Sequence, residues 1–288
     1  MKALWEQADE IPVTLVLLVA YVSLAMVTGL GRPDPEKLAA FGWLTPSLAA
    51  NGEPWRLLAH ALLHGGFVHL AFNGYMLVMV GPSLERSLGS VRFALLYVVA
   101  ALGGAIAVCL FYPIAQPVVG GSGALFGMLG ALVALFARSG RHAFAFLAFE
   151  GPRALLGMIA ANLVIGLLLP FVSNTAHVGG LLAGFVVTML WLAPPRRQNP
   201  WLRPWRIAVG ALFASLLFWS LVPTTRWDWL WYRAARTGGT AQEGLDRAAA
   251  MSLFDVPAVG RGDAHLAREQ IRQLLMELPP GHVPELPK

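Results

Sequence analysis

Five long stretches of the chain contain no charged residue. They cover residues 11–31, 57–84, 93–137, 154–195 and 207–225. Each stretch is long enough to cross the ~30 Å hydrocarbon layer of a bilayer at least once. Proline, glycine and polar clusters divide them into seven predicted helical spans, near residues 11–30, 66–83, 92–112, 122–137, 154–171, 177–194 and 206–222. The pattern predicts an all-α polytopic membrane protein.

The amino-acid composition agrees with this fold class. Hydrophobic residues make up 57% of the chain and charged residues 13%, against ~25% charged residues in an average soluble domain. Glu6, Asp9 and Glu10 precede the first apolar stretch, which favours a retained first span over a cleaved secretory signal. The single cysteine, Cys109, excludes an intrachain disulfide and a cysteine-based metal cluster.

The basic residues gather in short connections between the predicted spans. The formal net charge is +5, but residues 226–288 hold eight basic and eight acidic residues, so the excess lies earlier in the chain. The positive-inside rule explains this distribution without nucleic acid. It places the N-terminus in the cytoplasm, and seven crossings then place the C-terminal tail outside. The predicted parts are a short cytoplasmic N-terminus (1–10), a six-helix core (11–195), a basic loop with a seventh helix (196–222) and an extramembrane tail (223–288).

Three polar residues lie near the predicted start of the second span. His69 and Asn73 are four positions apart, so their side chains share one face of a helix. We expect His64 at the beginning of the same span. Intramembrane His and Asn either join helices by hydrogen bonds or belong to a functional site, and the spacing alone leaves both interpretations open.

Ser122 opens the predicted fourth span directly after Gly120 and Gly121. The glycines let the backbone turn immediately before the helix, and a helix N-terminus presents unpaired N–H groups that favour an anion. An oxyanion hole requires this geometry. The alternative interpretation is helix packing, because Gly123 and Gly127 form a small-xxx-small pair typical of closely approaching membrane helices.

His177 lies at the start of the sixth span, followed by a second small-xxx-small pair, Gly180 and Gly184. Spans four and six enter from the same predicted external side, so Ser122 and His177 can lie at similar depth and face each other. A neutral histidine next to a serine hydroxyl can accept its proton and act as a general base.

A zinc site made from His64, His69 and His177 is the main chemical alternative. His64 and His69 are five positions apart, unlike the i, i+4 histidine pair of H-E-x-x-H. The predicted spans also contain no Asp or Glu that would serve as a fourth ligand or base. The sequence therefore favours a site without a metal or cofactor.

Taken together, these residues resemble the rhomboid family of intramembrane serine proteases. The resemblance covers residues 10–195, and the order and spacing of its motifs make it specific. The motifs that carry it are His64-x4-His69-x3-Asn73, Gly120-Gly121-Ser122-Gly123, His177-x2-Gly180-x3-Gly184, Trp55-Arg56 and Glu85-Arg86-Ser87-Leu88-Gly89-Ser90.

The resemblance implies a rhomboid-like six-helix core with a water-filled cavity open to the external side. It implies Ser122 as the nucleophile and His177 as the general base of an acyl-enzyme reaction, without a third carboxylate. Asn73, His69 and the Ser122 backbone N–H would form the oxyanion site. The substrates of the family are single-span membrane proteins, which are cut near the external membrane surface.

Other residues match supporting positions of the family. Phe126, one turn after the serine, matches an aromatic residue that packs on the catalytic imidazole. The resemblance also implies that span five and residues 170–176 form a mobile gate and cap. The seventh helix is an addition to the six-helix core that only some members of the family have, and the resemblance does not extend to the tail. The remaining supporting positions are His64, Gly120, Gly121, Gly123, Gly180 and Gly184.

Two other function classes compete with a protease. A membrane transporter or channel would use His69, Asn73 and His177 as a polar pathway, but no intramembrane carboxylate or lysine is present to couple ions. An inactive rhomboid-like protein would hold membrane clients without cutting them, although Ser122 and His177 are both present. We therefore expect a rhomboid-type serine endopeptidase of a bacterial inner membrane, with the lipid bilayer and transmembrane substrates as its partners.

Overall fold

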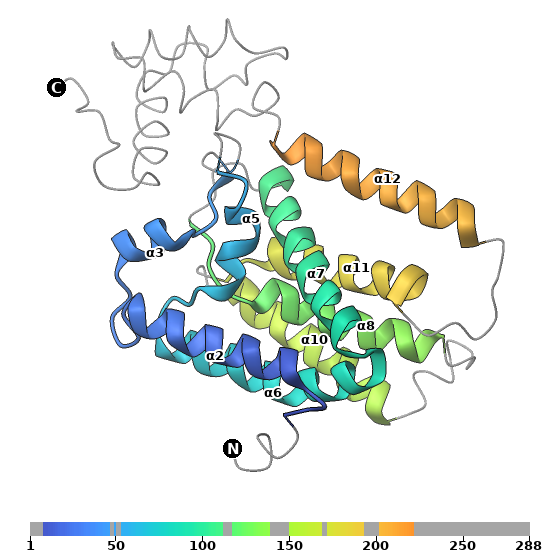
Figure 1. Ribbon diagram of the computed structural model, residues 1–288, viewed down its shortest axis with the longest axis horizontal. Coiled ribbons are helices and arrows are strands. Elements are labelled where there is room, and N and C mark those ends of the chain that lie inside the picture. Colours follow the sequence, from blue (N-terminus) through green and yellow to red (C-terminus); the bar gives the residue numbers. More distant parts are fainter. Residues whose placement is uncertain are drawn as a thin grey trace, which may run out of the picture.

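The computed structural model describes residues 8–46, 49, 53–111, 117–138, 150–168, 172–192 and 202–221. The predicted tail and most of the basic loop before the seventh helix lie outside the described residues. Helices dominate the described part (Figure 1). In chain order they are α2 (Pro12–Val27), α3 (Pro35–Phe41), α5 (Arg56–Ala59), the 3-10 turn η1 (His60–Leu62), α6 (Phe67–Leu88), α7 (Ser90–Phe111), α8 (Ser122–Ala137), α10 (Glu150–Leu168), α11 (Asn174–Val187), the π-helical turn η2 (Thr188–Leu192) and α12 (Leu202–Leu221).

The predicted all-α class is confirmed. In the ranges above, the only pairing of the β type is an isolated antiparallel bridge between Leu44 and Val118. Each predicted span coincides with an apolar helix. Among the described residues, 4 helices are long and apolar enough to cross a membrane: Phe67–Leu88, Ser90–Phe111, Asn174–Leu192 and Pro204–Leu221. Three shorter apolar helices are Pro12–Val27, Ser122–Ala137 and Leu155–Leu168.

Helix α8 lies in the middle of the bundle (Figure 1). Helices α7 and α11 pack against it most extensively, and α6 and α10 flank it. Met128 and Leu129 of α8 are fully buried. The peripheral helix α12 contacts α7 and η2, and only 6% of its apolar window is buried, against 67% for α7. The site that begins α8 is therefore held at the centre of the protein.

Glycines let α8 and α11 approach until their backbones touch. A Cβ atom added to Gly180 would overlap the carbonyl oxygen of Gly123, and one added to Gly184 would overlap that of Gly127. The small-xxx-small pairs thus have the packing role that their pattern favoured. Because Ser122 immediately precedes Gly123, and His177 lies three residues before Gly180, the same contact brings the start of α8 close to the start of α11.

Helix α6 begins later and ends later than the pattern of apolar residues predicted. It starts at Phe67, after Gly66, whose φ of +110° lies in the left-handed region. The prediction that His64 belongs to this span is therefore wrong: His64 precedes the helix. At the other end, α6 continues to Leu88, so that Glu85 lies in its last turn and not in a connection after it.

Glu85 itself is fully buried in this last turn, because it is paired with the start of α2. Its carboxylate accepts hydrogen bonds from the Val13 N–H (2.9 Å), the Thr14 N–H (2.8 Å) and the Thr14 hydroxyl (2.7 Å). The first N–H groups of α2 have no partner within their own helix, and a carboxylate is favoured at this positive end. A charged residue that seemed to end one span therefore caps the start of another.

The segment between α2 and α6 is organised by a buried arginine. Arg56 is 2% exposed, and a buried charge needs compensating partners. Its Nε donates to Glu53 Oε2 (2.7 Å), and its Nη1 donates to the carbonyl oxygens of Ala39 (2.8 Å) and Trp43 (3.1 Å). The adjacent bridge between Leu44 and Val118 then attaches this segment to the strand-like residues just before Ser122.

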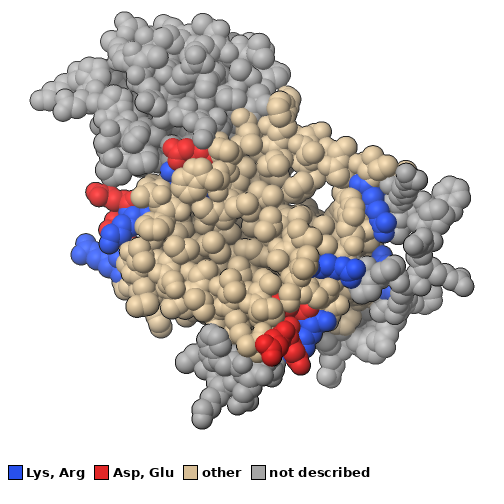
Figure 2. All heavy atoms as spheres, in the orientation of Figure 1, with Lys and Arg blue, Asp and Glu red and all other residues tan. Residues whose placement is uncertain are grey.

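Charged side chains lie at the margins of the molecule. Figure 2 shows a face that is largely free of charge, with basic and acidic groups gathered at its edges. Large apolar side chains are exposed on the outside of the helix bundle. Examples are Phe72 of α6, which is 69% exposed, and Leu167 of α10, which is 79% exposed. Such an exterior suits lipid and would be costly in water.

Candidate active site

Ser122 is the first residue of α8, and two glycines form the turn that leads into it. Gly120 has a φ of +124°, which a residue with a side chain rarely adopts. The Gly120 N–H donates to the His60 carbonyl oxygen of η1 (2.9 Å). The turn therefore presents the Ser122 side chain and the first N–H groups of α8, which lack partners within their helix.

His177 lies in the first turn of α11, whose start is capped by the Ser173 side chain accepting from the Ala176 N–H. Its Nε2 atom lies 2.9 Å from the Ser122 hydroxyl oxygen. The Phe126 ring stacks on the imidazole, with centroids 4.1 Å apart and planes 5° from parallel. Within the described residues, the His177 Nδ1 atom has no hydrogen-bond partner, so the stacked ring sets the imidazole orientation.

His69 and Asn73 of α6 lie next to the glycine turn. The position that a Cβ atom of Gly120 would take lies 2.6 Å from His69 Nε2 and 3.5 Å from Asn73 Nδ2. His69 Nδ1 accepts from the Gly65 N–H at 3.3 Å, so a neutral His69 carries its proton on Nε2. Asn73 Nδ2 is buried and has no hydrogen-bond partner in the part of the chain that the structure describes. Two side-chain donors therefore lie beside the turn that precedes Ser122.

His64 contacts this group of side chains through His69. Its ring packs edge-on against Tyr21, with centroids 4.5 Å apart, and against His69, with centroids 5.3 Å apart. Burial and then the nearby His69 lower the pKa of His64 to about 3. Burial likewise lowers the pKa of His60, which also lies outside the spanning helices, to about 4. Both imidazoles are therefore neutral at pH 7.

Three residues near the site were missed by the sequence analysis. His60 is buried, its Nδ1 donates to the Arg56 carbonyl oxygen (3.0 Å), and its own carbonyl holds Gly120. The hydroxyls of Tyr21 and Tyr97 lie 2.9 Å apart in the core beneath Gly121. A backbone contact has no sequence signal, but a tyrosine inside an apolar span does, because its hydroxyl needs a partner.

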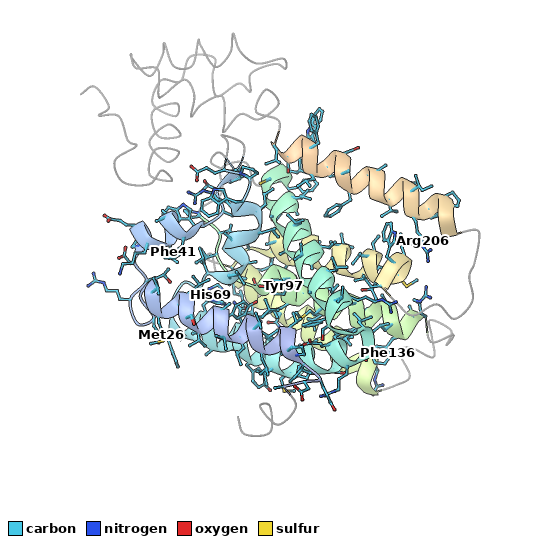
Figure 3. The ribbon with its side chains drawn as sticks, viewed as in Figure 1. Met26, Phe41, His69, Tyr97, Phe136 and Arg206 are labelled. Carbon is cyan, nitrogen blue, oxygen red and sulfur yellow. The ribbon has the colours of Figure 1, made fainter. Side chains whose placement is uncertain are left out.

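Figure 3 shows His69 and Tyr97 near the middle of the bundle, whereas Met26, Phe136 and Arg206 lie toward its edges. The central group combines a hydroxyl, a neighbouring imidazole and unpaired N–H donors, the components required for acyl transfer. Among the described residues, no three His, Cys, Asp or Glu side chains lie close enough together to hold a metal ion.

The site lies within a segment that is similar to known proteins. The Rhomboid domain family matches residues 51–194, half of the chain. Rhomboid protease GluP of Bacillus subtilis is 44% identical over 155 residues, which cover 54% of this chain and 29% of that protein. RHOMBOID-like protein 5 of Arabidopsis thaliana is 38% identical over 176 residues, which cover 59% of this chain and 54% of that protein.

A shorter relative is matched over most of its length. Putative rhomboid protease YdcA of Bacillus subtilis is 34% identical over 149 residues, which cover 52% of this chain and 73% of that protein. The chain spans less than two thirds of GluP and of RHOMBOID-like protein 5. The shared segment contains all the residues gathered around Ser122 except Tyr21. This chain is therefore an integral, multi-pass membrane protein that belongs to the rhomboid family.

Proposed function

We propose that this protein is an intramembrane serine protease that hydrolyses a peptide bond in or next to a transmembrane segment of its substrates. The observation that carries the proposal is the 2.9 Å separation between the Ser122 hydroxyl oxygen and His177 Nε2 at the N-terminus of α8. Nucleophile and base lie within direct hydrogen-bond reach, as this class of catalysis requires. The similarity to proteins named rhomboid protease supports the same activity.

The reaction begins with the Ser122 hydroxyl donating its proton to Nε2 of the neutral His177. The Ser122 oxygen attacks the carbonyl carbon of the scissile bond and forms a tetrahedral oxyanion. The resulting His177 imidazolium gives its proton to the leaving amine, which leaves an ester on Ser122. A water molecule, activated in turn by His177, hydrolyses this ester and restores the hydroxyl.

Three donors stabilise the oxyanion in this proposal. They are the Ser122 N–H at the helix N-terminus, the Asn73 amide and the His69 Nε2–H. The two side-chain donors lie beside the glycine turn that leads into Ser122. The absence of a hydrogen-bond partner for Asn73 Nδ2 among the described residues supports its assignment, because a buried amide without a partner is costly unless it serves an intermediate. Phe126, by stacking on His177, takes over the orienting role that a carboxylate has in a three-residue triad.

The orientation in the membrane follows from the charge pattern. We place the N-terminus in the cytoplasm and the start of α8 and α11 on the external side of a bacterial inner membrane. Residues 223–288 then lie on the same side as the site. The substrates are transmembrane proteins that reach the site laterally or through its external opening, and neither a metal nor a cofactor takes part.

The test uses the purified protein with a fluorophosphonate probe and a tagged single-span substrate. Wild-type protein should form an adduct on Ser122, and Ser122→Ala and His177→Ala should each abolish cleavage while the protein still folds. Asn73→Ala should retain its fold and lose ~10²- to 10³-fold in kcat, as for removal of one oxyanion donor. Turnover by Ser122→Ala would refute the proposal. A wild-type protein that binds the substrate, takes up no probe and cuts nothing would instead be an inactive member of the family.

A further inference from the structure

Two tyrosine hydroxyls from different helices meet in the core below the glycine turn. Tyr21 of α2 is fully buried and Tyr97 of α7 is 6% exposed. Their hydroxyl oxygens lie 2.9 Å apart, and the Tyr97 hydroxyl donates to the carbonyl oxygen of Ala61 in η1 at 2.9 Å. Tyr21 and Tyr97 are 76 positions apart in the chain, and Tyr97 and Ala61 are 36 positions apart. The two hydrogen bonds therefore join three separate elements.

The direction of the hydrogen bonds is fixed by proton count. A hydroxyl has one proton to donate, and Tyr97 gives its proton to the Ala61 carbonyl. The Tyr21 hydroxyl therefore donates to the Tyr97 oxygen. The result is a directed chain from α2 through α7 to η1, in which every step lies in the protein interior. In such surroundings each bond is stronger than in water, and each missing partner is more costly.

This chain ends on the backbone that supports the nucleophile. Ala61 follows His60, whose carbonyl accepts the Gly120 N–H at 2.9 Å. The space that a side chain on Gly121 would take is occupied by the Tyr21 hydroxyl, and the Ala61 carbonyl oxygen lies 3.1 Å from the same position. The Gly120–Gly121 backbone is thus supported by η1 through Gly120 and by Tyr21 through Gly121.

We propose that Tyr97 and Tyr21 are positioning residues that hold the Gly120–Gly121 turn, and with it the Ser122 N–H and hydroxyl, in the geometry for attack. Neither tyrosine touches the reacting atoms. Tyr97 acts by keeping the Ala61 carbonyl in place, and Tyr21 acts by orienting Tyr97 and filling the side of Gly121. The inference rests on the proposed protease function, because a positioned nucleophile matters only if Ser122 reacts.

The physical reason is the sensitivity of catalysis to small displacements. A shift of ~1 Å in a positioning element can cost ~10²-fold in rate. Loss of the Tyr97 hydroxyl takes the donor away from the Ala61 carbonyl, and η1 then relaxes together with the Gly120 contact. Loss of the Tyr21 hydroxyl leaves the donor to Ala61 intact, so the turn should move less.

The experiment compares Tyr97→Phe, Tyr21→Phe and the double variant with Tyr75→Phe in the full-length protein. Tyr75 is a matched control, because it lies on α6 at 64% exposure on the apolar exterior. Each variant is measured for the rate of fluorophosphonate labelling and for kcat and KM with a transmembrane substrate. All rates are expressed per folded molecule, and thermal stability is recorded in the same preparation.

Tyr97→Phe should lower kcat and the labelling rate by about tenfold or more while KM stays within about twofold, since only the reacting geometry changes. Tyr21→Phe should have a smaller effect of the same kind. The double variant should be slower than Tyr97→Phe by no more than the small effect of Tyr21→Phe, because Tyr21 acts partly through Tyr97 and partly by its direct contact with Gly121. Tyr75→Phe should match the wild type.

Other outcomes overturn the inference. If Tyr97→Phe and Tyr21→Phe lose thermal stability but label and cleave at the wild-type rate per folded molecule, the hydroxyls are structural only. If Tyr97→Phe does not fold, Tyr21→Phe decides, and a wild-type rate for that variant counts against the proposal. A wild-type protein that neither labels nor cleaves refutes the proposed function itself, whereas an active wild type with unaffected tyrosine variants refutes only this inference.

Discussion

Helices α11 and α10 both pack on the central helix α8, but they do so in different ways. On α11, Gly180 and Gly184 bring its backbone against the carbonyl oxygens of Gly123 and Gly127 along the helix. On α10, among the side chains that the structure describes, burial is greatest in one half of the helix and falls toward its end. The buried residues Leu155 and Ile159 lie in its first half, whereas Leu167 and Leu168 near its end are 79% and 75% exposed.

The difference separates a tightly packed helix that carries a residue of the site from a helix that is more loosely packed on α8. Backbone contact leaves no flexible side chain to absorb a displacement, so His177 on α11 is held rigidly relative to Ser122 on α8. The last turns of α10 are instead tied to α11 by the side chain of Asn174, whose Nδ2 donates to the Leu163 carbonyl oxygen at 2.9 Å. Low packing of this kind marks the segments that open at low free-energy cost.

The largest effect should come from removing the backbone contact of α11. In Gly180→Ala, the new methyl group overlaps the Gly123 carbonyl oxygen, and neither backbone can move aside without separating the helices. We expect a loss of about 1–3 kcal/mol in the free energy of unfolding and a loss of ~10²-fold in activity as Ser122 and His177 separate. Thermal unfolding and probe labelling in the same detergent measure both, and near-wild-type values would contradict rigid packing.

A smaller effect should come from releasing the end of α10. Asn174→Ala removes the hydrogen bond to Leu163 and should cost about 1 kcal/mol. We expect the backbone amides of residues 163–168 to exchange hydrogen faster, while the labelling rate of Ser122 changes little because the dyad is held elsewhere. Asn162→Ala is the matched control, because the Asn162 side chain bonds to the Met158 carbonyl within α10 itself. Equal exchange in the two variants would show that Asn174 does not hold α10.

The smallest effect should come from a glycine-to-alanine substitution on the loosely packed helix α10. Gly157 of α10 has nothing within 4 Å of the position that a Cβ atom would take. In Gly157→Ala, the helix propensity of alanine should therefore raise stability by up to about 1 kcal/mol, with no change in probe labelling. A marked loss of stability in thermal unfolding would mean that α10 packs as tightly as α11.

The sequence by itself determined the membrane class and the positions of the helices. In the part of the chain that the structure describes, every predicted span contains an apolar helix. A backbone in lipid must satisfy its N–H and C=O groups internally, and that requirement is local. Three features of the site are also local patterns, and their spacing in the sequence predicted them. They are the Gly120–Gly121 turn before Ser122, the shared face of His69 and Asn73, and the glycine pairs of α8 and α11. The charged residues predicted the end of a helix less well, since Glu85 lies inside α6 and the predicted span ended near residue 83.

Only the tertiary structure decided which faces of the helices meet. Lipid is as apolar as leucine, so a helix that is hydrophobic all round has no pattern that reveals its buried side. Three contacts depend on how each helix is rotated and shifted along its neighbours. They are the pairing of Ser122 with His177 across 55 positions, the capping of α2 by Glu85 and the contact between Tyr21 and Tyr97. The hydrogen bond from Gly120 to the His60 carbonyl is even harder to predict from the sequence. Every residue has a carbonyl, and only the fold determines which one accepts the bond.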